Sequence, residues 1–183
     1  MGVLCFIKHI LLGFPVEVGW ALLLVLCLGT ILIISIKGIK QRWRLLFRLM
    51  FILYIVLIFT VTVFLRSNGE QFDYNFHPFW SYYEAIREGR NELAAEMIMN
   101  VVLFIPLGPL SAGSFKRIKW WQVLFVSLCI SLTIETMQLL FKRGFAEFDD
   151  LFHNVIGCML GYGMFLFLRK IFEGFSKRGE AAM

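Results

Sequence analysis

Charged residues are scarce in this 183-residue chain, in which Asp, Glu, Lys and Arg together make up 17%, against about 25% in typical soluble domains. Hydrophobic residues make up 59%, and the mean hydropathy is +0.75. A soluble domain of this size has too little interior to hide so much apolar side chain. The scarcity of charge therefore excludes a soluble enzyme, a disordered chain and a disulfide-stapled secreted domain. It predicts an integral membrane protein.

Cysteine pairs and metal-binding spacings are also missing from the sequence. Four cysteines stand alone in apolar stretches and are expected to be buried thiols: Cys5, Cys27, Cys129 and Cys158. The sequence has no HExxH motif. We therefore predict no cofactor and no metal, and we assign no catalytic residue. A divalent ion stays open as an alternative, with ligands from Glu135, Asp149, Asp150 and His153.

Long runs with little or no charge indicate how the chain crosses a membrane, because a spanning helix needs about 20 mostly apolar residues. Five runs qualify: Val18–Ile36, Leu49–Leu65, Met97–Phe115, Trp120–Phe141 and Leu151–Leu168. A shorter apolar segment, Val3–Phe14, precedes them and is expected to be interfacial. The predicted fold is an all-α polytopic membrane helix bundle with about five transmembrane helices plus this short N-terminal segment.

Basic residues are distributed unequally between the two sides of such a bundle. Twelve of the 18 fall between the first and second spans, between the third and fourth, and after the fifth. Positive residues mark the cytoplasmic side, so we expect the N-terminus outside and the C-terminus in the cytoplasm. Their placement in short segments between apolar runs argues against nucleic-acid binding.

The expected organisation has four parts: an N-terminal apolar segment with two spans (1–65), an extracytoplasmic loop (66–96), a three-helix core (97–168) and a basic cytoplasmic tail (169–183). The loop is acidic and contains the aromatic stretch Phe76–Tyr83. Aromatic rings prefer the membrane interface, so this stretch predicts an interfacial belt. A lid over a ligand site is the alternative.

A polar stripe runs along the fourth span, where Ser127, Ser131, Glu135 and Gln138 recur at helical spacing. A charged side chain at the bilayer centre costs about 2.5–3.5 kcal/mol. An interhelical polar contact returns only about 0.6 kcal/mol on average. The stripe should therefore face protein, and Glu135 indicates a functional site more strongly than a purely structural network.

Two other spans carry polar residues at a similar depth. Asp150 and Asn154 lie at the start of the fifth span, and Asn100 lies about 5 Å inside the third. We expect these residues to converge with Glu135 in an outward-open polar pocket, with a kink at Pro106 helping to form its floor. The alternative is a self-satisfied hydrogen-bond network that holds the bundle together.

The neighbouring positions add two further expectations. Arg143, in the connection between the fourth and fifth spans, could pair with Glu147, Asp149 or Asp150, or bind an anionic head group. Gly157 and Gly161 form a GxxxG step, which lets another helix approach closely. A homo-oligomer formed through these two glycines is one expected use of that step.

Two segments together resemble the VanZ-like family of bacterial membrane proteins. The first runs from Asn100 to Gly108 as Asn-Val-Val-Leu-Phe-Ile-Pro-Leu-Gly. The second combines Glu-Thr-Met-Gln, ending at Gln138, with Arg-Gly-Phe-Ala-Glu-Phe-Asp-Asp, ending at Asp150, and His-Asn-Val-Ile-Gly, ending at Gly157. The resemblance covers about half of the chain, Phe76–Tyr162. It implies ligand-binding positions at Asn100, Glu135, Gln138, Arg143, Asp149, Asp150 and Asn154.

The resemblance also implies a multi-pass protein of the bacterial inner membrane, linked to susceptibility to glycopeptide and lipoglycopeptide antibiotics of the teicoplanin type. The first functional hypothesis is a binding protein whose partners are membrane lipids and a cell-wall lipid intermediate or lipoglycopeptide. The second is a membrane-embedded enzyme that modifies an envelope lipid or glycan, with Glu135 as general base. The third is a scaffold subunit for envelope enzymes.

Overall fold

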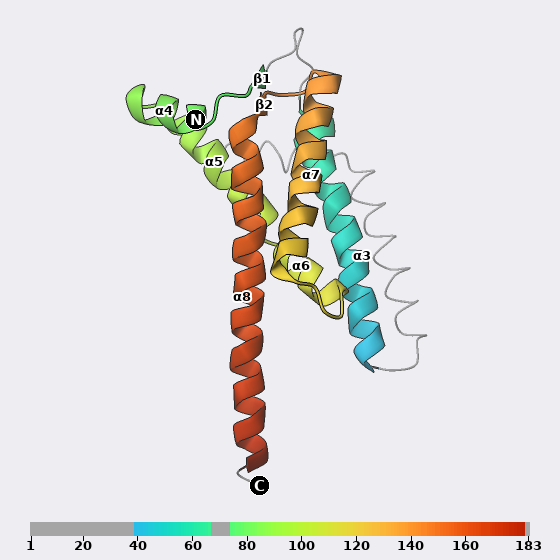
Figure 1. Ribbon diagram of the computed structural model, residues 1–183. Helices are drawn as coiled ribbons and strands as arrows, with labels where there is room; N and C mark the ends of the chain where they lie inside the picture. Colours follow the sequence, from blue (N-terminus) through green and yellow to red (C-terminus); the bar gives the residue numbers. More distant parts are fainter. Residues whose placement is uncertain (1–38, 67–73, 182–183) are drawn as a thin grey trace.

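A computed structural model describes residues 39–66 and 74–181 as a helix bundle (Figure 1). The elements are α3 (Ile39–Phe59), η1 (Thr60–Phe64), β1 (Tyr74–Asn75), α4 (Trp80–Arg87), α5 (Asn91–Phe104), α6 (Leu107–Ser114), α7 (Trp120–Phe141), β2 (Ala146–Glu147) and α8 (Phe148–Ala181). Strand is limited to two residues in each of β1 and β2 within these ranges. The predicted all-α class is confirmed.

Four helical stretches are long and apolar enough to cross a membrane: Arg42–Phe64, Leu93–Ser114, Trp120–Phe141 and Phe148–Gly174. They correspond to four of the five predicted spans. Large apolar side chains point outward from them, such as Ile52, Phe125 and Phe167, each about 60% exposed or more. Lipid is the environment in which such an outward-facing surface is stable. The predicted span Val18–Ile36 and the segment Val3–Phe14 lie outside the described residues.

The third span is interrupted at Pro106, where a kink was predicted. Helix α5 ends at Phe104, and Pro106 is the N-terminal cap of α6. Proline has no N–H to continue the helical ladder, so the hydrogen bonding of the helix is broken there. Helix α6 packs against both α3 and α8 (Figure 1).

Glycines bring α8 into close contact with the backbone of α5 and α6. A Cβ atom added to Gly157 would lie 2.1 Å from the Val101 carbonyl oxygen, and one added to Gly161 would lie 1.9 Å from the Ile105 oxygen. No larger residue fits at such distances without a shift of the helices. The close approach predicted for these glycines therefore occurs within the chain. Because α5 covers this face, a second copy would have to use a different surface.

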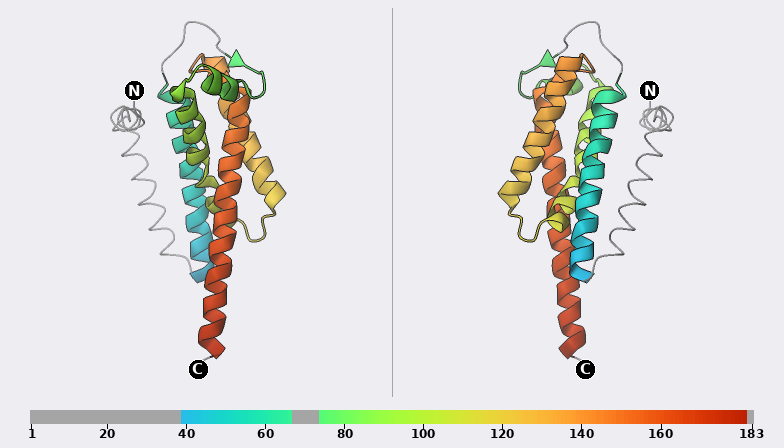
Figure 2. Two further views of the ribbon diagram at one scale, coloured as in Figure 1. Left: turned by 90° about the vertical axis from the view of Figure 1, so that its left-hand side faces the viewer. Right: turned by 90° about the vertical axis from the view of Figure 1, so that its right-hand side faces the viewer.

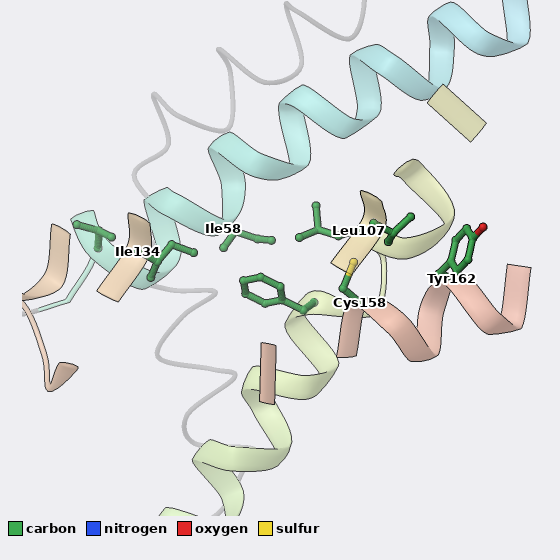
Figure 3. Close-up of a cluster of buried hydrophobic side chains, with 8 residues drawn as sticks. Ile58, Leu107, Ile134, Cys158 and Tyr162 are labelled. Carbon is green, nitrogen blue, oxygen red and sulfur yellow. The ribbon is translucent and has the colours of Figure 1, made fainter. Parts of the chain in front are cut away.

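The apolar core lies where α3, α5, α6, α7 and α8 meet (Figure 3). Ile58, Leu107, Ile134, Cys158 and Tyr162 contribute to it from four helices and are at most 7% exposed. Cys158 is buried, as predicted. The prediction of a buried thiol is wrong for Cys129, which is exposed on α7 because the polar stripe of that helix occupies its inward face. Cys5 and Cys27 lie outside the described residues.

One end of the bundle gathers the polar residues. There β1 pairs in parallel with β2, with Tyr74 opposite Ala146 and Asn75 opposite Glu147. This pairing joins the chain before α4 to the connection between α7 and α8 (Figure 1). We call this end, where η1, α4, β1, β2, the last turns of α7 and the first turns of α8 meet, the polar end.

At the opposite end α8 continues well beyond the other helices (Figure 2). It runs without a break to Ala181, past Arg169 and Lys170. Residues after Leu168, expected to form a basic tail, thus extend the last helix through Ala181. The sequence has no proline there that would end it.

Candidate functional site

The polar stripe of α7 faces inward, as predicted. Its four members are buried: Ser127, Ser131, Glu135 and Gln138. The Asn154 side-chain amide on α8 donates a 2.8 Å hydrogen bond to Ser131 Oγ. One turn further from the polar end, the Ser127 hydroxyl donates to the Leu124 carbonyl of its own helix at 2.9 Å. The bond between Asn154 and Ser131 therefore joins α8 to α7 along this stripe.

Glu135 is the stripe residue with the most charged neighbours. It is 8% exposed, and one of its carboxylate oxygens accepts the backbone N–H of Glu147 at 3.0 Å. Asp150 and Glu147 also interact electrostatically with it, and so does the cationic Arg66. Helices α7 and α8 and strand β2 thus bring several carboxyl groups together at Glu135, and Arg66, which follows η1, adds one guanidinium.

Gln138 and Arg143 complete the end of η1, a π-helix. The last carbonyls of a helix have no partner within it. Gln138 Nε2 donates to the Thr62 carbonyl at 3.0 Å, and Arg143 Nη1 donates to the Phe64 carbonyl at 2.5 Å. A cation at a helix C-terminus also interacts favourably with the helix dipole. Both side chains therefore fix the end of the second span relative to α7.

Asp149 caps helix α4 from the first turn of α8. Its Oδ1 accepts the backbone N–H of Phe79 at 2.6 Å, and its Oδ2 accepts that of Ser81 at 3.0 Å. The Ser81 hydroxyl donates to Glu147 Oε2 at 2.5 Å. A carboxylate at a helix N-terminus satisfies free N–H groups and complements the helix dipole. The carboxyl groups of Asp149 and Glu147 therefore hold helix α4 against the start of α8.

Glu147 has a strongly shifted proton affinity. Burial, together with the nearby carboxylates of Asp150, Glu96 and Asp149, raises its pKa from an ordinary value of 4.5 to about 7. The hydrogen bond from Ser81 acts in the opposite direction. Glu147 therefore changes charge near neutral pH, at the point where α4 is attached.

His153 is a residue of the polar end that the sequence prediction did not include among the ligand-binding positions. It is 2% exposed, and its Nε2 lies 2.7 Å from the Tyr82 hydroxyl of α4. Its Nδ1 lies 3.6 Å from Asp150 Oδ1. A histidine three residues after an acid, on the inward face of a predicted helix, is the signal that could have identified it.

Six of the seven predicted positions meet at the polar end: Glu135, Gln138, Arg143, Asp149, Asp150 and Asn154. Asn100 lies on α5, next to the Val101 carbonyl that contacts Gly157. Among the described residues, no hydrogen bond joins the Asn100 side chain to the other six. Helix α5 therefore contributes mainly backbone contact to this part of the protein.

Three buried polar atoms at or next to this cluster have no hydrogen-bond partner: Gln138 Oε1, Asn154 Oδ1 and His153 Nδ1. Buried polar groups are normally paired, because an unpaired one costs about 1–3 kcal/mol. The two amide oxygens and the surrounding carboxylates are all acceptors. This excess of acceptors favours a ligand that brings N–H or O–H donors. Within the described residues, no group of three or more His, Cys, Asp and Glu side chains is placed to hold a metal ion.

Comparison with known proteins agrees with these observations. The chain matches the family described as VanZ/LLP1 over residues 45–169. A curated relative, Protein VanZ of Enterococcus faecium, is 37% identical over 70 residues, which are 38% of this chain and 44% of that relative. No solved structure matches. With four apolar helices long enough to span a bilayer and a family match over well more than half of its length, the chain is a membrane protein that belongs to the VanZ/LLP1 family.

Proposed function

We propose that this chain contributes to resistance against glycopeptide and lipoglycopeptide antibiotics of the teicoplanin type by binding the head group of an amphiphile at the polar end. The family membership and the similarity to Protein VanZ support the resistance role. The proposed ligand is a cell-wall lipid intermediate or the lipoglycopeptide itself. Both classes combine an apolar tail with a head group rich in hydroxyl and amide groups.

The excess of buried acceptors carries this proposal. Asn154 Oδ1 and Gln138 Oε1 lack donors, and the Glu135 and Asp150 carboxylates lie close to each other. A head group that supplies hydroxyl, amide or ammonium donors would pair these atoms. The exposed aromatic side chains of Phe79 and Tyr82, held beside the cluster by Asp149 and His153, could pack against its apolar part.

The position of the basic residues supports an outward-facing polar end. Arg42, Arg44 and Arg48 lie in the first turns of α3, and Lys116, Arg117 and Lys119 lie between α6 and α7, both at the opposite end of the bundle (Figure 1). Positive residues remain in the cytoplasm. We therefore propose a bacterial inner-membrane protein with its C-terminus in the cytoplasm. The predicted span Val18–Ile36 would place the N-terminus outside.

Deletion and complementation test the proposal. Minimum inhibitory concentrations of teicoplanin, vancomycin and a lipoglycopeptide would be measured in a deletion strain that carries the wild type, Glu135→Gln or Asn154→Ala. Thr136→Val is the matched control, because Thr136 is exposed on α7 and bonds only to its own helix at the Leu132 carbonyl. We expect the wild type and the control to restore resistance, and the two polar-end variants to fail at equal membrane expression.

Two results would contradict the proposal. If all four versions restore resistance, the polar cluster serves the scaffold and not a ligand. If deletion changes none of the inhibitory concentrations, this member has no resistance role. Binding of teicoplanin to the purified full chain in nanodiscs, measured by calorimetry for the wild type and Glu135→Gln, separates direct capture of the antibiotic from capture of a cell-wall lipid.

A further inference from the structure

His153 is a buried base to which the proposed head-group contacts assign no chemical role. It is almost completely buried, yet one ring nitrogen reaches a tyrosine that is 40% exposed, and the other faces an aspartate. A hydroxyl within 2.6–3.2 Å of a base, with the base oriented by a third group, is the arrangement by which proteins activate a hydroxyl. The 2.7 Å distance between the Tyr82 oxygen and His153 Nε2 meets the first part of this criterion, and Asp150 Oδ1, 3.6 Å from Nδ1, is the acidic group on the other side of the ring.

We propose that Tyr82, His153 and Asp150 form a general acid–base relay, whose exposed phenol exchanges a proton with a hydroxyl or ammonium group of a bound head group. In this relay Tyr82 meets the ligand, His153 accepts and returns the proton, and Asp150 is a positioning residue. The relay uses side chains from two helices, α4 and α8, which the hydrogen bonds of Asp149 hold together.

The proton path is balanced without any other reactant. The relay requires the His153 tautomer that has its proton on Nδ1, on the side of Asp150, so that Nε2 accepts the Tyr82 O–H. When the ligand donates its proton to the Tyr82 oxygen, the phenolic proton passes to Nε2. The resulting imidazolium then lies 3.6 Å from the Asp150 carboxylate, which stabilises its charge. The reverse transfer returns the proton to the ligand.

The charges around the relay favour particular ligand groups. Asp149 and Asp150 of α8, Glu147 of β2 and Glu135 of α7 surround the start of α8, and their carboxylates interact with one another. Directly at the relay these carboxylates repel an anionic group and do not repel a neutral hydroxyl or a cationic ammonium. Any phosphate of the same ligand would have to lie away from them, on the side of a cation such as Arg66. The choice of a head group as substrate rests on the proposed function. The relay itself rests only on the three side chains.

A purely structural bond between Tyr82 and His153 makes the opposite prediction. If the bond only holds α4 in place, it shields the phenol, and Tyr82 should react with electrophiles more slowly than a free tyrosine. The neighbouring Tyr83 provides that comparison within the same molecule, because it is 53% exposed and contacts Arg87 instead of a base. The relative reaction rates of the two adjacent tyrosines thus distinguish a proton relay from a purely structural hydrogen bond.

Sulfonylation of the full chain in nanodiscs tests the relay. An aryl sulfonyl fluoride forms an O–S bond with a tyrosine, the S–F bond breaks, fluoride leaves, and the phenolic proton goes to the nearby base. Mass spectrometry would give the rate at each tyrosine. General-base assistance is worth about 10²–10⁴-fold, so we expect Tyr82 to react at least about 10-fold faster than Tyr83. His153→Gln keeps a hydrogen-bond acceptor without the base and should abolish the difference, and Asp150→Asn should reduce it.

Equal rates at Tyr82 and Tyr83 in the wild type, or an unchanged ratio in His153→Gln, would overturn the relay. Hydrogen exchange at the Ser81 amide checks that α4 stays docked in each variant.

In the resistance assay, Tyr82→Phe should lose function and Tyr83→Phe should keep it. If Tyr82 is reactive but Tyr82→Phe keeps resistance, the head-group substrate is wrong. If deletion has no phenotype, the proposed function fails while the reactivity still decides the relay.

Discussion

Helix α8 uses two different kinds of contact along its length. Its first two turns carry Asp149, His153 and Asn154, which are held by hydrogen bonds to α4 and α7. Its next two turns carry Gly157 and Gly161, which lie directly against the backbone of α5 and its C-terminal cap. The first region joins side chains through polar bonds, and the second joins helices through close backbone contact.

The two regions should respond differently to mutation. A glycine contact has no space for a single added carbon, so substitution forces the helices apart. A polar contact within a membrane protein averages only about 0.6 kcal/mol, so much of the first region can change at little cost in stability. This contrast indicates that the glycine region determines the fold, whereas the polar end is free to serve a ligand.

The largest expected effect is therefore that of Gly161→Ala. The new Cβ would lie 1.9 Å from the Ile105 carbonyl oxygen, and we expect a loss of about 3 kcal/mol or more in the free energy of unfolding. The matched control is Gly163→Ala, two residues along α8, where nothing lies within 4 Å. Thermal unfolding in detergent measures both. Similar unfolding temperatures for the two variants would contradict the tight contact between α5 and α8.

A smaller and more local effect is expected from Asp149→Ala. This change removes both acceptors from the N-terminus of α4, which leaves the N–H groups of Phe79 and Ser81 unpaired. Hydrogen bonds to charged groups contribute about 1.5–3 kcal/mol, so exchange of these two amides should become about 10- to 100-fold faster.

Hydrogen-exchange mass spectrometry of the full chain measures this change, and the amides of α7 provide the internal reference. Global loss of protection would mean that Asp149 stabilises the entire bundle. In that case the proposed division between the two regions would be wrong, because a residue of the polar end would determine the fold.

The third largest expected effect is a dependence of the free energy of unfolding on pH, caused by Glu147. Its raised pKa means that the folded protein binds a proton more tightly than the unfolded chain does. The free energy of unfolding should therefore fall as the pH rises from about 4.5 to about 7 and change little from this group above that. Partial exposure of Glu147 keeps the effect modest. Glu147→Gln should flatten the slope, measured as unfolding temperature against pH, and an identical slope in this variant would contradict the assignment.

The sequence allowed much of this fold to be predicted, because its signals are local. Runs such as Trp120–Phe141 coincide with a helix, and Pro106 coincides with the break between α5 and α6. The spacing of Ser131, Glu135 and Gln138 coincides with an inward face. Helix formation in a membrane follows from composition and length, since every backbone group must be satisfied within its own segment. The same reasoning cannot name the helix that packs against a given face.

The polar end was harder to predict for that reason. Its residues were expected to gather, but the identity of their partners depends on contacts far apart in the sequence. Asp149 pairs with N–H groups 70 and 68 residues away, and Arg143 pairs with a carbonyl 79 residues away. The π-helix that exposes this carbonyl leaves no clear sequence pattern. His153 was not among the predicted ligand-binding positions, because its partner Tyr82 lies on another helix, far away in the sequence.

The smallest expected effect, from Gln138→Met, decides whether the polar end is a scaffold or a site. Methionine has a similar volume, so the change removes one hydrogen bond to the Thr62 carbonyl together with the unpartnered Oε1. We expect a loss of less than about 1 kcal/mol in the free energy of unfolding. If stability is retained but teicoplanin resistance is lost, the unpartnered oxygen serves a ligand. A loss well above about 2 kcal/mol would instead mean that the polar stripe stabilises the bundle, and the contrast between the two regions of α8 would disappear.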